Sequence, residues 1–411
     1  MKNLSFFTLR DFNKHGGGGL RILGIVNALS LTNVNARIFL NDSGYNKTLI
    51  SNKVDRTNIN VYFSQFEKRI IQFLIAFLPV FFVTFIFKKK ISKLRLVLDD
   101  SSIKNQEIVF FEYLDLSIGY VLKTKGVIKG YICDIHGIGP NEFKYKKNNV
   151  FLNKMKYFAA VLLERKVFSR ASGFIFASKS MQNYFHSNYP KIKHKKHIII
   201  PYCVETDACL SEVDSALLGS IRDKFDIKEN DEIIFFAGSF KYIGGITCLV
   251  KAYKQVLDTK SEAKLFLIGT GEEVEAVRDI IKSNELSSKV IHLDKIPYSQ
   301  LRTYQEIASV IVCPDRDNLF SHMVLHLKYL DSLASNKIVI NGMFDSVMEI
   351  NNHEELSINF QPSSISSLVE RIIFSLKHRE VLLNRYKNNN NYVKDNFTYE
   401  NAISELKKLA S

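Results

Sequence analysis

Residues 232–271 read EIIFFAGSFKYIGGITCLVKAYKQVLDTKSEAKLFLIGTG, and this stretch decides the fold class. Glu232–Ala237 is a short apolar run that predicts a strand, and a glycine-containing turn follows it. The apolar spacing of Ile246–Leu257 predicts a helix, and Ala263–Ile268 predicts the next strand. A strand, turn, helix and strand in this order are typical of a parallel sheet that helices cover.

The same alternation continues toward residue 340, with helices predicted at 273–283, 299–307 and 323–335 and strands at 290–293, 310–313 and 337–340. It also runs through the first half of the chain, where helices are predicted at 20–30 and 151–170. Strands are predicted there at Leu4–Leu9, Ala36–Leu40, Ile108–Phe111, Tyr131–Ile135, Gly173–Ala177 and Ile198–Pro201. We therefore expect an α/β protein with two Rossmann-like, doubly wound domains that face a cleft.

A polar stretch at 205–231 separates the two series of strands. We place one domain at 1–205 and the other at 206–395, and we expect a final helix at about 396–411 to pack back on the first domain. A chain of 411 residues is long enough for two domains of this size.

Charge is distributed unevenly between the two halves. Residues 1–205 carry 32 Lys and Arg against 13 Asp and Glu, a net of +19, whereas residues 206–411 carry 24 against 29, a net of −5. The first half therefore suits an anionic partner, either nucleic acid or a lipid surface, and no aromatic–basic motif supports nucleic acid. The five cysteines are odd in number and form no C-x-x-C pair, which favours a reducing cytoplasm over a disulfide framework or a zinc site.

Ile70–Phe87 is an uncharged run of 18 residues with Lys68 and Arg69 before it and three lysines after it. Three interpretations are open: a membrane span, a buried core helix, or an interfacial or re-entrant membrane contact. Pro79 in the middle, basic residues on both flanks and the division of a sheet by a span all argue against spanning. We favour the interfacial contact, which would place the protein peripherally on the inner face of the cell membrane.

Glycines follow several of the predicted strands. Gly16–Gly19, with Gly17 and Gly18 at its centre, lies between the first strand and a helix, where backbone amides favour an anion. Gly238 and Ser239 end a strand in the second half, and Lys241 follows them; Gly269 and Gly271 end the next strand. These turns expose amides to a ligand, or else are plain turns.

Three further side chains are candidates for chemistry, and one short motif is set aside. His136 follows the predicted strand Tyr131–Ile135, at the ligand-binding edge of a doubly wound sheet. Lys328 and Asp331 lie three residues apart on one helix face, which suits a cation for phosphate and a carboxylate for ribose hydroxyls, or else a simple ion pair. Asp315-Arg-Asp317 has the spacing of a D-x-D metal motif, but we expect no metal site there.

Together these pieces resemble the GT-B glycosyltransferases, specifically the retaining family-four enzymes of bacterial surface polysaccharide synthesis. The resemblance covers nearly the whole chain and rests on the order of five segments. These are ERKVFSRASGFIFASKSM at 164–181, IPYCVETDA at 200–208, FAGSFKYIGGITCLVKAY at 236–253, HLKYLDSLASNKIVI at 326–340 and NFTYENAISEL at 396–406.

The resemblance implies transfer of a sugar, with retention, from a UDP- or GDP-linked donor to a lipid-linked glycan of the O-antigen or capsule type. It implies no metal and no other cofactor. The first domain would face the acceptor and the anionic membrane surface, and the second would bind the nucleotide-sugar. His136 would hold the sugar, and lysines, amides and helix N-termini would stabilise the leaving diphosphate.

The sequence departs from the family pattern at several positions. The family's phosphate-binding arginine and lysine fall at Ser239 and Gly244, and Lys241 is a substitute for one of them. The first glutamate of the E-x7-E pair falls at Met323 and the second at Asp331. These departures motivate two alternatives: a catalytically degenerate, membrane-associated partner of another transferase, and a GT-B sugar-nucleotide epimerase.

Overall fold

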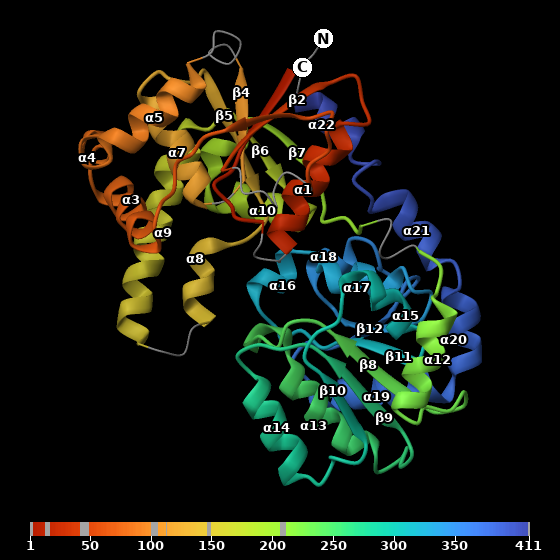
Figure 1. Ribbon diagram of the computed structural model, residues 1–411. Coiled ribbons are helices and arrows are strands. Elements are labelled where there is room, and N and C mark those ends of the chain that lie inside the picture. Colours follow the sequence, from red (N-terminus) through yellow and green to blue (C-terminus); the bar gives the residue numbers. More distant parts are fainter. Residues whose placement is uncertain are drawn as a thin grey trace. The chain divides into compact units, whose positions relative to one another are not determined.

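The computed structural model describes residues 3–12, 17–41, 49–99, 106–111, 113–145, 149–205 and 211–409 (Figure 1). The chain divides into two compact units. The first consists of Met1–Pro201 with Tyr399–Ser411, and the second of Tyr202–Thr398. Each unit is an α/β structure of its own, as the alternating pattern predicts.

The first unit is built on a seven-stranded sheet in the order β3-β2-β1-β4-β5-β6-β7, and every neighbouring pair is parallel. Its strands are β1 (Asn3–Phe7), β2 (Asn35–Leu40), β3 (Asp55–Asn58), β4 (Glu107–Phe110), β5 (Gly130–Ile135), β6 (Gly173–Phe176) and β7 (Lys196–Ile199). Its longer helices are α1 (Gly17–Leu29), α3 (Gln65–Phe77), α4 (Val80–Ile86), α5 (Lys88–Leu98), α7 (Tyr113–Thr124), α9 (Val150–Arg170), α10 (Lys179–Asn188) and α22 (Ile403–Leu409). Short turns at α8 (Gly139–Glu142), η1 (Phe143–Tyr145) and η2 (Pro190–Ile192) complete it.

The second unit has a six-stranded parallel sheet in the order β10-β9-β8-β11-β12-β13. Its strands are β8 (Ile233–Ala237), β9 (Lys264–Ile268), β10 (Val290–Leu293), β11 (Val310–Cys313), β12 (Ile338–Gly342) and β13 (Ile358–Phe360). Its longer helices are α12 (Ser215–Lys224), α13 (Ile246–Val256), α14 (Val274–Ser283), α17 (Leu327–Leu333), α19 (Ile365–Lys377), α20 (Arg379–Tyr386) and α21 (Asn389–Asn396). Shorter ones are η3 (Tyr242–Gly244), η4 (Tyr298–Gln300), α15 (Leu301–Gln305), α16 (Leu319–Met323) and α18 (Asp345–Met348).

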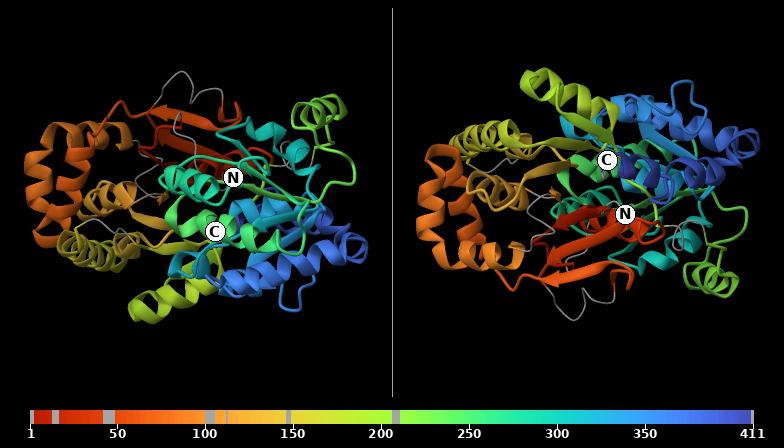
Figure 2. Two further views of the ribbon diagram at one scale, coloured as in Figure 1. Left: turned by 90° about the horizontal axis from the view of Figure 1, so that it is seen from below. Right: turned by 90° about the horizontal axis from the view of Figure 1, so that it is seen from above.

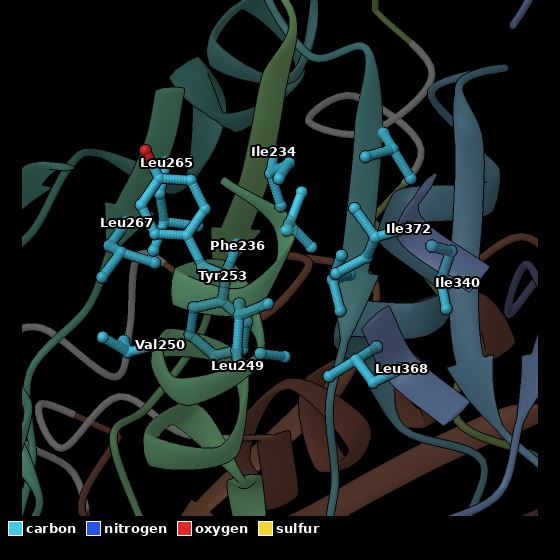
Figure 3. Packing of buried hydrophobic residues seen from close by; sticks show 14 of the residues in the cluster. Ile234, Phe236, Leu249, Val250, Tyr253, Leu265, Leu267, Ile340, Leu368 and Ile372 are labelled. Carbon is cyan, nitrogen blue, oxygen red and sulfur yellow. The ribbon is translucent and has the colours of Figure 1, made fainter. Parts of the chain in front are cut away.

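The core of the second unit explains why its strands read as continuous apolar runs. Side chains from β8, β9 and β12 meet those of α13 and α19 on one face of the sheet (Figure 3). A second cluster, around Phe235, Phe266 and Ile311, packs against the opposite face. Because both faces are covered, successive strand residues are buried whichever way they point.

The segment Ile70–Phe87 forms two short helices and not one long helix. α3 ends at Phe77, Leu78 caps it in an extended conformation, and Pro79 precedes α4, since proline removes a helical hydrogen bond. No helix among the described residues is both long and apolar enough to cross a membrane. α3, α4 and α5 lie together on one side of the first unit (Figure 2), and α3 packs against α9.

Other expected boundaries also change. α1 begins at Gly17, so Gly17 and Gly18 form its first turn and are not a loop that precedes it. The helix expected at 323–335 is shorter: α17 runs from Leu327 to Leu333, residues 324–326 are not helical, and Met323 is the last residue of a separate helix, α16. β3 and β13 were not expected: β3 reads DRTN at the sheet edge, and β13 has only three residues.

The chain returns to the first unit at its carboxyl end. Val204 donates a backbone hydrogen bond to Phe397 O at 2.9 Å, so the segment that follows β7 is joined to the segment that follows α21. A Cβ built on Gly24 of α1 would lie 2.0 Å from the ring of Tyr399, so only glycine at position 24 admits that ring. α22 then lies against β7.

Candidate active site

The sheet of the second unit reverses its strand order between β8 and β11, which are neighbours although two strands separate them in sequence. In open α/β sheets, ligands bind at the carboxyl ends of the strands at such a point. The loops that leave β8, β9 and β11 therefore define the candidate site of this unit. They contain Gly238, Gly269 and Asp315.

The loop after β8 brings the start of α13 to this point. Gly245 has φ +67°, in the left-handed region, and a Cβ there would lie 1.9 Å from Pro314 O. The Arg316 N–H donates to Ile243 O at 2.9 Å, so the β8 and β11 loops are fixed to each other. Glycine is thus required at 245, and the first turn of α13 presents backbone amides beside the β11 loop.

The loop after β9 lies against the same turn. Gly269 has φ +153°, and a Cβ there would lie 1.9 Å from Gly238 O. Phe240 N donates to Thr270 O at 3.0 Å, and the Gly269 N–H donates to Leu293 O at 2.8 Å. A Cβ on Gly271 would also collide with the backbone of Phe240. The glycines expected at 238, 269 and 271 are therefore brought together by close backbone packing.

Lys328, on α17, extends into this cluster of glycines. Its Nζ donates to Asp315 Oδ1 at 2.8 Å, and it lies 5.4 Å from the centre of the Phe236 ring. A Cβ built on Gly244 would be 3.9 Å from Nζ, and one on Gly238 would be 3.4 Å from Lys328 Cδ. The side chain is 17% exposed, whereas that of Asp315 is 2% exposed. An ammonium group is thus held at the glycine turn by a buried carboxylate.

His326 lies next to this ion pair, with its Nδ1 3.5 Å from Asp315 Oδ1. Burial lowers the pKa of His326, although the Asp315 carboxylate partly opposes that shift. The imidazole is therefore neutral at neutral pH, and Lys328 is the cation that Asp315 holds.

Asp331 lies one helical turn beyond Lys328. Its side chain is buried, and the Tyr298 hydroxyl donates to Oδ1 at 2.8 Å. Ser239 and Lys241 are exposed on the β8 loop. Met323, where the family has its first glutamate, is buried with only 6% exposure. Asp331 therefore has a supporting hydroxyl that the sequence does not reveal.

The two aspartates of Asp315-Arg-Asp317 have different partners. Asp315 pairs with Lys328, whereas Asp317 Oδ1 lies 3.1 Å from His322 Nε2. Between them, the Arg316 guanidinium stacks on Tyr242 at 4.2 Å. Within the ranges that the structure describes, no group of three or more His, Cys, Asp or Glu side chains is placed to hold a metal ion.

In the first unit, His136 lies just beyond β5 and is joined to a fully buried ion pair. Its Nδ1 is 3.0 Å from Asp134 Oδ2, and its side chain is 16% exposed. Arg21 of α1 donates to both oxygens of Asp134, at 2.8 Å from Nη2 to Oδ1 and 2.9 Å from Nε to Oδ2. The Arg21 Nη1 also donates to Ile200 O at 2.7 Å and to Pro201 O at 3.0 Å.

The first turn of α1, which includes Gly17 and Gly18, lies only a few residues before Arg21. Gly16, the first of the four expected glycines, lies outside the described residues. A Cβ on Gly19 would be 3.1 Å from Arg10 Nε, so this turn lies beside the chain that leaves β1. The glycines and His136 are therefore linked, through Arg21 and Asp134, within one unit.

Sequence reasoning missed Arg21, Asp134, Asp315 and Tyr298 as members of these clusters. Two of them carry a usable signal. Asp134 is two residues before His136, so strand alternation puts both on one face, and Asp315 comes two residues after a buried strand. Arg21 is 113 residues from its partner, and no local pattern indicates such a pair.

Known proteins resemble this chain in two ways, in the sequence of its second unit and in its overall fold. Residues 219–392 match the model of the family described as "Glycosyl transferases group 1". An uncharacterised glycosyltransferase of Methanocaldococcus jannaschii is 24% identical over 189 residues, which cover 45% of this chain and 46% of the relative. The chain therefore spans less than half of that relative's length in the matched region.

Two solved structures share the fold over the whole chain. Sucrose-phosphate synthase from Thermosynechococcus elongatus has a TM-score of 0.73 and 14% identity, with 100% of this chain and 98% of that chain covered. HepE of Anabaena in complex with UDP has a TM-score of 0.70 and 14% identity, with 99% and 100% covered. The chain therefore has the GT-B fold, as the sequence predicts. More narrowly, the part of the chain that matches the group 1 glycosyltransferase family lies within the second unit.

Proposed function

We propose that the protein transfers a sugar, with retention of configuration, from a nucleotide-sugar to a lipid-linked glycan in the synthesis of a cell-surface polysaccharide. One observation carries the proposal: the Lys328 ammonium lies among glycines at the switch point of the second sheet, beside the start of α13. A cation and free helix amides together suit a diphosphate.

The proposed role of this cluster is to stabilise charge. As the bond between sugar and diphosphate breaks, negative charge grows on the leaving diphosphate oxygen atoms. Lys328, Lys241 and the backbone amides of the first turn of α13 are donors that this charge would strengthen. Asp315 holds Lys328 in place before the ligand arrives, so the cation needs little reorganisation. No metal or other cofactor is assigned to this step.

The nucleotide end of the donor is proposed to lie at Asp331. Its buried carboxylate, supported by the Tyr298 hydroxyl, suits the hydroxyls of a ribose. HepE, which shares the fold, has been solved with UDP and with UDP-glucose. This supports a UDP-linked donor as the first to test, with a GDP-linked donor as the second.

Lys328 can be tested against a matched lysine in the same unit. Lys337, just before β12, also binds one carboxylate at 2.8 Å, from Glu306, and is 14% exposed. It lies at the opposite, amino end of the strands. We expect Lys328→Met to abolish the thermal shift that UDP or GDP gives the wild type, and Lys337→Met to keep it. Equal shifts for both variants would contradict the diphosphate assignment.

Turnover is tested by nucleotide release from a panel of UDP- and GDP-sugars, with membrane extract as the source of acceptor. Release that depends on extract supports transfer. Binding of a nucleotide without release from any donor would instead favour the degenerate, non-catalytic alternative, which the buried Met323 motivates. Interconversion of the donor sugar without an acceptor would favour the epimerase.

Docking on an anionic membrane is proposed as the way in which the lipid-linked acceptor is reached. α3 and α4 leave large apolar side chains exposed, among them Phe81 at 61% and Phe85 at 71%. The first half of α9, which packs beside α3, exposes a further set: Val150, Phe151, Leu152, Met155 and Phe158. This apolar surface and the net charge of +19 on residues 1–205 suit an anionic leaflet.

Liposome flotation tests the docking. We expect the wild type to float with anionic vesicles and a variant with Phe81, Phe82 and Phe85 changed to Ser to sediment. The matched control changes three exposed apolar residues elsewhere, Leu31, Phe374 and Val381, to Ser, and should still float. High salt should weaken flotation only partly, because apolar contact is not screened. Folded wild type that stays with the pellet would rule out docking.

A further inference from the structure

Beyond the candidate donor site, the first unit contains a buried Arg21–Asp134 ion pair that contacts His136. We propose that Asp134, fixed by Arg21, is a positioning residue for His136 that keeps the imidazole in the tautomer with its proton on Nδ1. The inference rests on the proposed function, since it assigns His136 Nε2 as the acceptor for a hydroxyl of the transferred sugar.

The first step concerns the charge of Asp134. Burial by itself would raise the pKa of this carboxyl, but the Arg21 guanidinium and hydrogen bonds from His136 and Arg21 outweigh it and hold that pKa at about 2. Asp134 is thus ionised at any pH at which the protein works. An ionised carboxylate has no proton to donate, so the 3.0 Å contact must be Nδ1–H donating to Oδ2.

The second step concerns rigidity. Arg21 and Asp134 both have 0% side-chain exposure, and the guanidinium binds the carboxylate through two of its nitrogens. Its third nitrogen is held by the carbonyls of Ile200 and Pro201 at the end of the strand β7. Asp134 therefore cannot rotate away from His136 without breaking several buried hydrogen bonds. The ring is held in one orientation as well as in one tautomer.

The third step is chemical. In the tautomer with its proton on Nδ1, an imidazole has its lone pair on Nε2, which accepts a hydrogen bond but donates none. The matching group on the substrate is a hydroxyl. A carbonyl or phosphate oxygen would need the opposite tautomer. We therefore expect donors that lack the contacted hydroxyl to turn over more slowly, because a buried acceptor without its donor is costly.

A double-mutant cycle on turnover tests whether Asp134 acts through His136. We expect Asp134→Asn to lower kcat by about 10–100-fold, the usual range for a partner that orients a functional histidine, with a smaller effect on KM. In a His136→Ala background the same change should have almost no further effect. An equal loss in both backgrounds would show that Asp134 only supports the fold, and would overturn the proposal.

Asp115→Asn is the matched control. Asp115 is also a buried carboxylate of the first unit, and it accepts the backbone N–H of Leu9 at 3.0 Å. The Asp115→Asn change should alter kcat by the same factor in the wild-type and in the His136→Ala backgrounds. Non-additivity of Asp115 with His136 of the same size as that of Asp134 would contradict a specific link.

A second measurement does not depend on whether an Asp134 variant folds, and it does not require turnover. Imidazole ¹⁵N resonances of the wild type, assigned by their loss in His136→Ala, should show a protonated Nδ1 and an unprotonated Nε2 for His136 at neutral pH. The reverse pattern overturns the proposal. Failure of the wild type to release nucleotide from any donor would count against the proposed function alone, because the ¹⁵N result decides the tautomer independently.

Discussion

Each unit has a cation from a helix that pairs with an aspartate at the carboxyl end of a strand, and the two pairs differ in how tightly they are enclosed. Arg21–Asp134 and Lys328–Asp315 both have a contact of 2.8 Å, and both aspartates are buried. Arg21, however, is fully buried and uses all its nitrogens, whereas Lys328 has one carboxylate bond and is 17% exposed.

The difference follows from the two side chains. A guanidinium has donors in a fixed planar arrangement, so several buried acceptors can lock it. An ammonium is a compact charge with three donors on a flexible chain, so it can keep one bond to a carboxylate and still donate to a phosphate. The same local motif therefore serves as a fixed support in one unit and as a candidate ligand contact in the other.

The largest effect is expected from breaking the enclosed pair. Arg21→Met leaves the Asp134 carboxylate buried without its cation, and should lower the free energy of unfolding by about 3–5 kcal/mol. Urea denaturation of the variant measures this loss. The control is a double variant, Arg21→Met with Asp134→Leu, which should regain most of the stability. If the single variant is as stable as the wild type, the pair is not the support inferred from its burial.

Glu164 of α9 sharpens the comparison, because its partners are the hydroxyls of Tyr113 and Tyr189, which both donate to it. Burial raises the pKa of Glu164 to about 7, and the two hydroxyls offset the shift only in part. A folded pKa above the ordinary value means that the contribution to stability is complete below about pH 4.5 and is lost as pH rises through about 7.

Relative to Glu164→Gln, the wild type should therefore lose about 3 kcal/mol of unfolding free energy between pH 4.5 and pH 8. Asp134 has the opposite sign: its low folded pKa gives stability above about pH 4 that is lost as pH falls through about 2. Urea denaturation of the wild type and of Glu164→Gln between pH 4.5 and pH 8 measures the difference in unfolding free energy, and the contributions of other groups cancel in that difference. A pH-independent difference would mean that Glu164 titrates normally.

A smaller effect is expected at Asp331, in the more open unit. Asp331→Ala removes a carboxylate that Tyr298 supports, and should weaken nucleotide-sugar binding by about 1–3 kcal/mol, the scale of a lost charged hydrogen bond. Calorimetric titration measures it, and Tyr298→Phe is the milder companion change. Unchanged affinity for every nucleotide that binds the wild type would remove Asp331 from the site.

The smallest effect is expected from a pair that neither unit encloses. Arg37 and Asp55 join β2 to β3, with side chains 32% and 53% exposed. Arg37→Gln should change the free energy of unfolding by less than about 1 kcal/mol, because water and salt screen such pairs. A loss comparable with that of Arg21→Met would show that exposure does not separate the pairs.

The parallel sheets could be predicted because their buried strands are continuous apolar runs between glycines and helices; β10 and β11 have the expected bounds. Polar DRTN at β3 has no such signal, since an edge strand can be half solvated. Gly238 and Gly269 could be placed at strand ends because turn residues follow apolar runs, and Lys328 was singled out by its helical spacing from Asp331; their roles toward a ligand stay predictions. Asp315 and Arg21 were not found, because their roles depend on partners far along the chain or on another loop.

The ring of Tyr399 in the gap left by Gly24 has a consequence for biosynthesis. The ribosome synthesises Gly24 and every strand of the first sheet before any of the second unit, whereas Tyr399, which fills this gap, is synthesised after the second unit. Translation of nearly two hundred residues, at about 5–20 residues per second, therefore separates the strands of the first sheet from the residue that completes the packing of α1. During those seconds the space beside Gly24 in α1 lacks the Tyr399 ring that fills it in the folded protein.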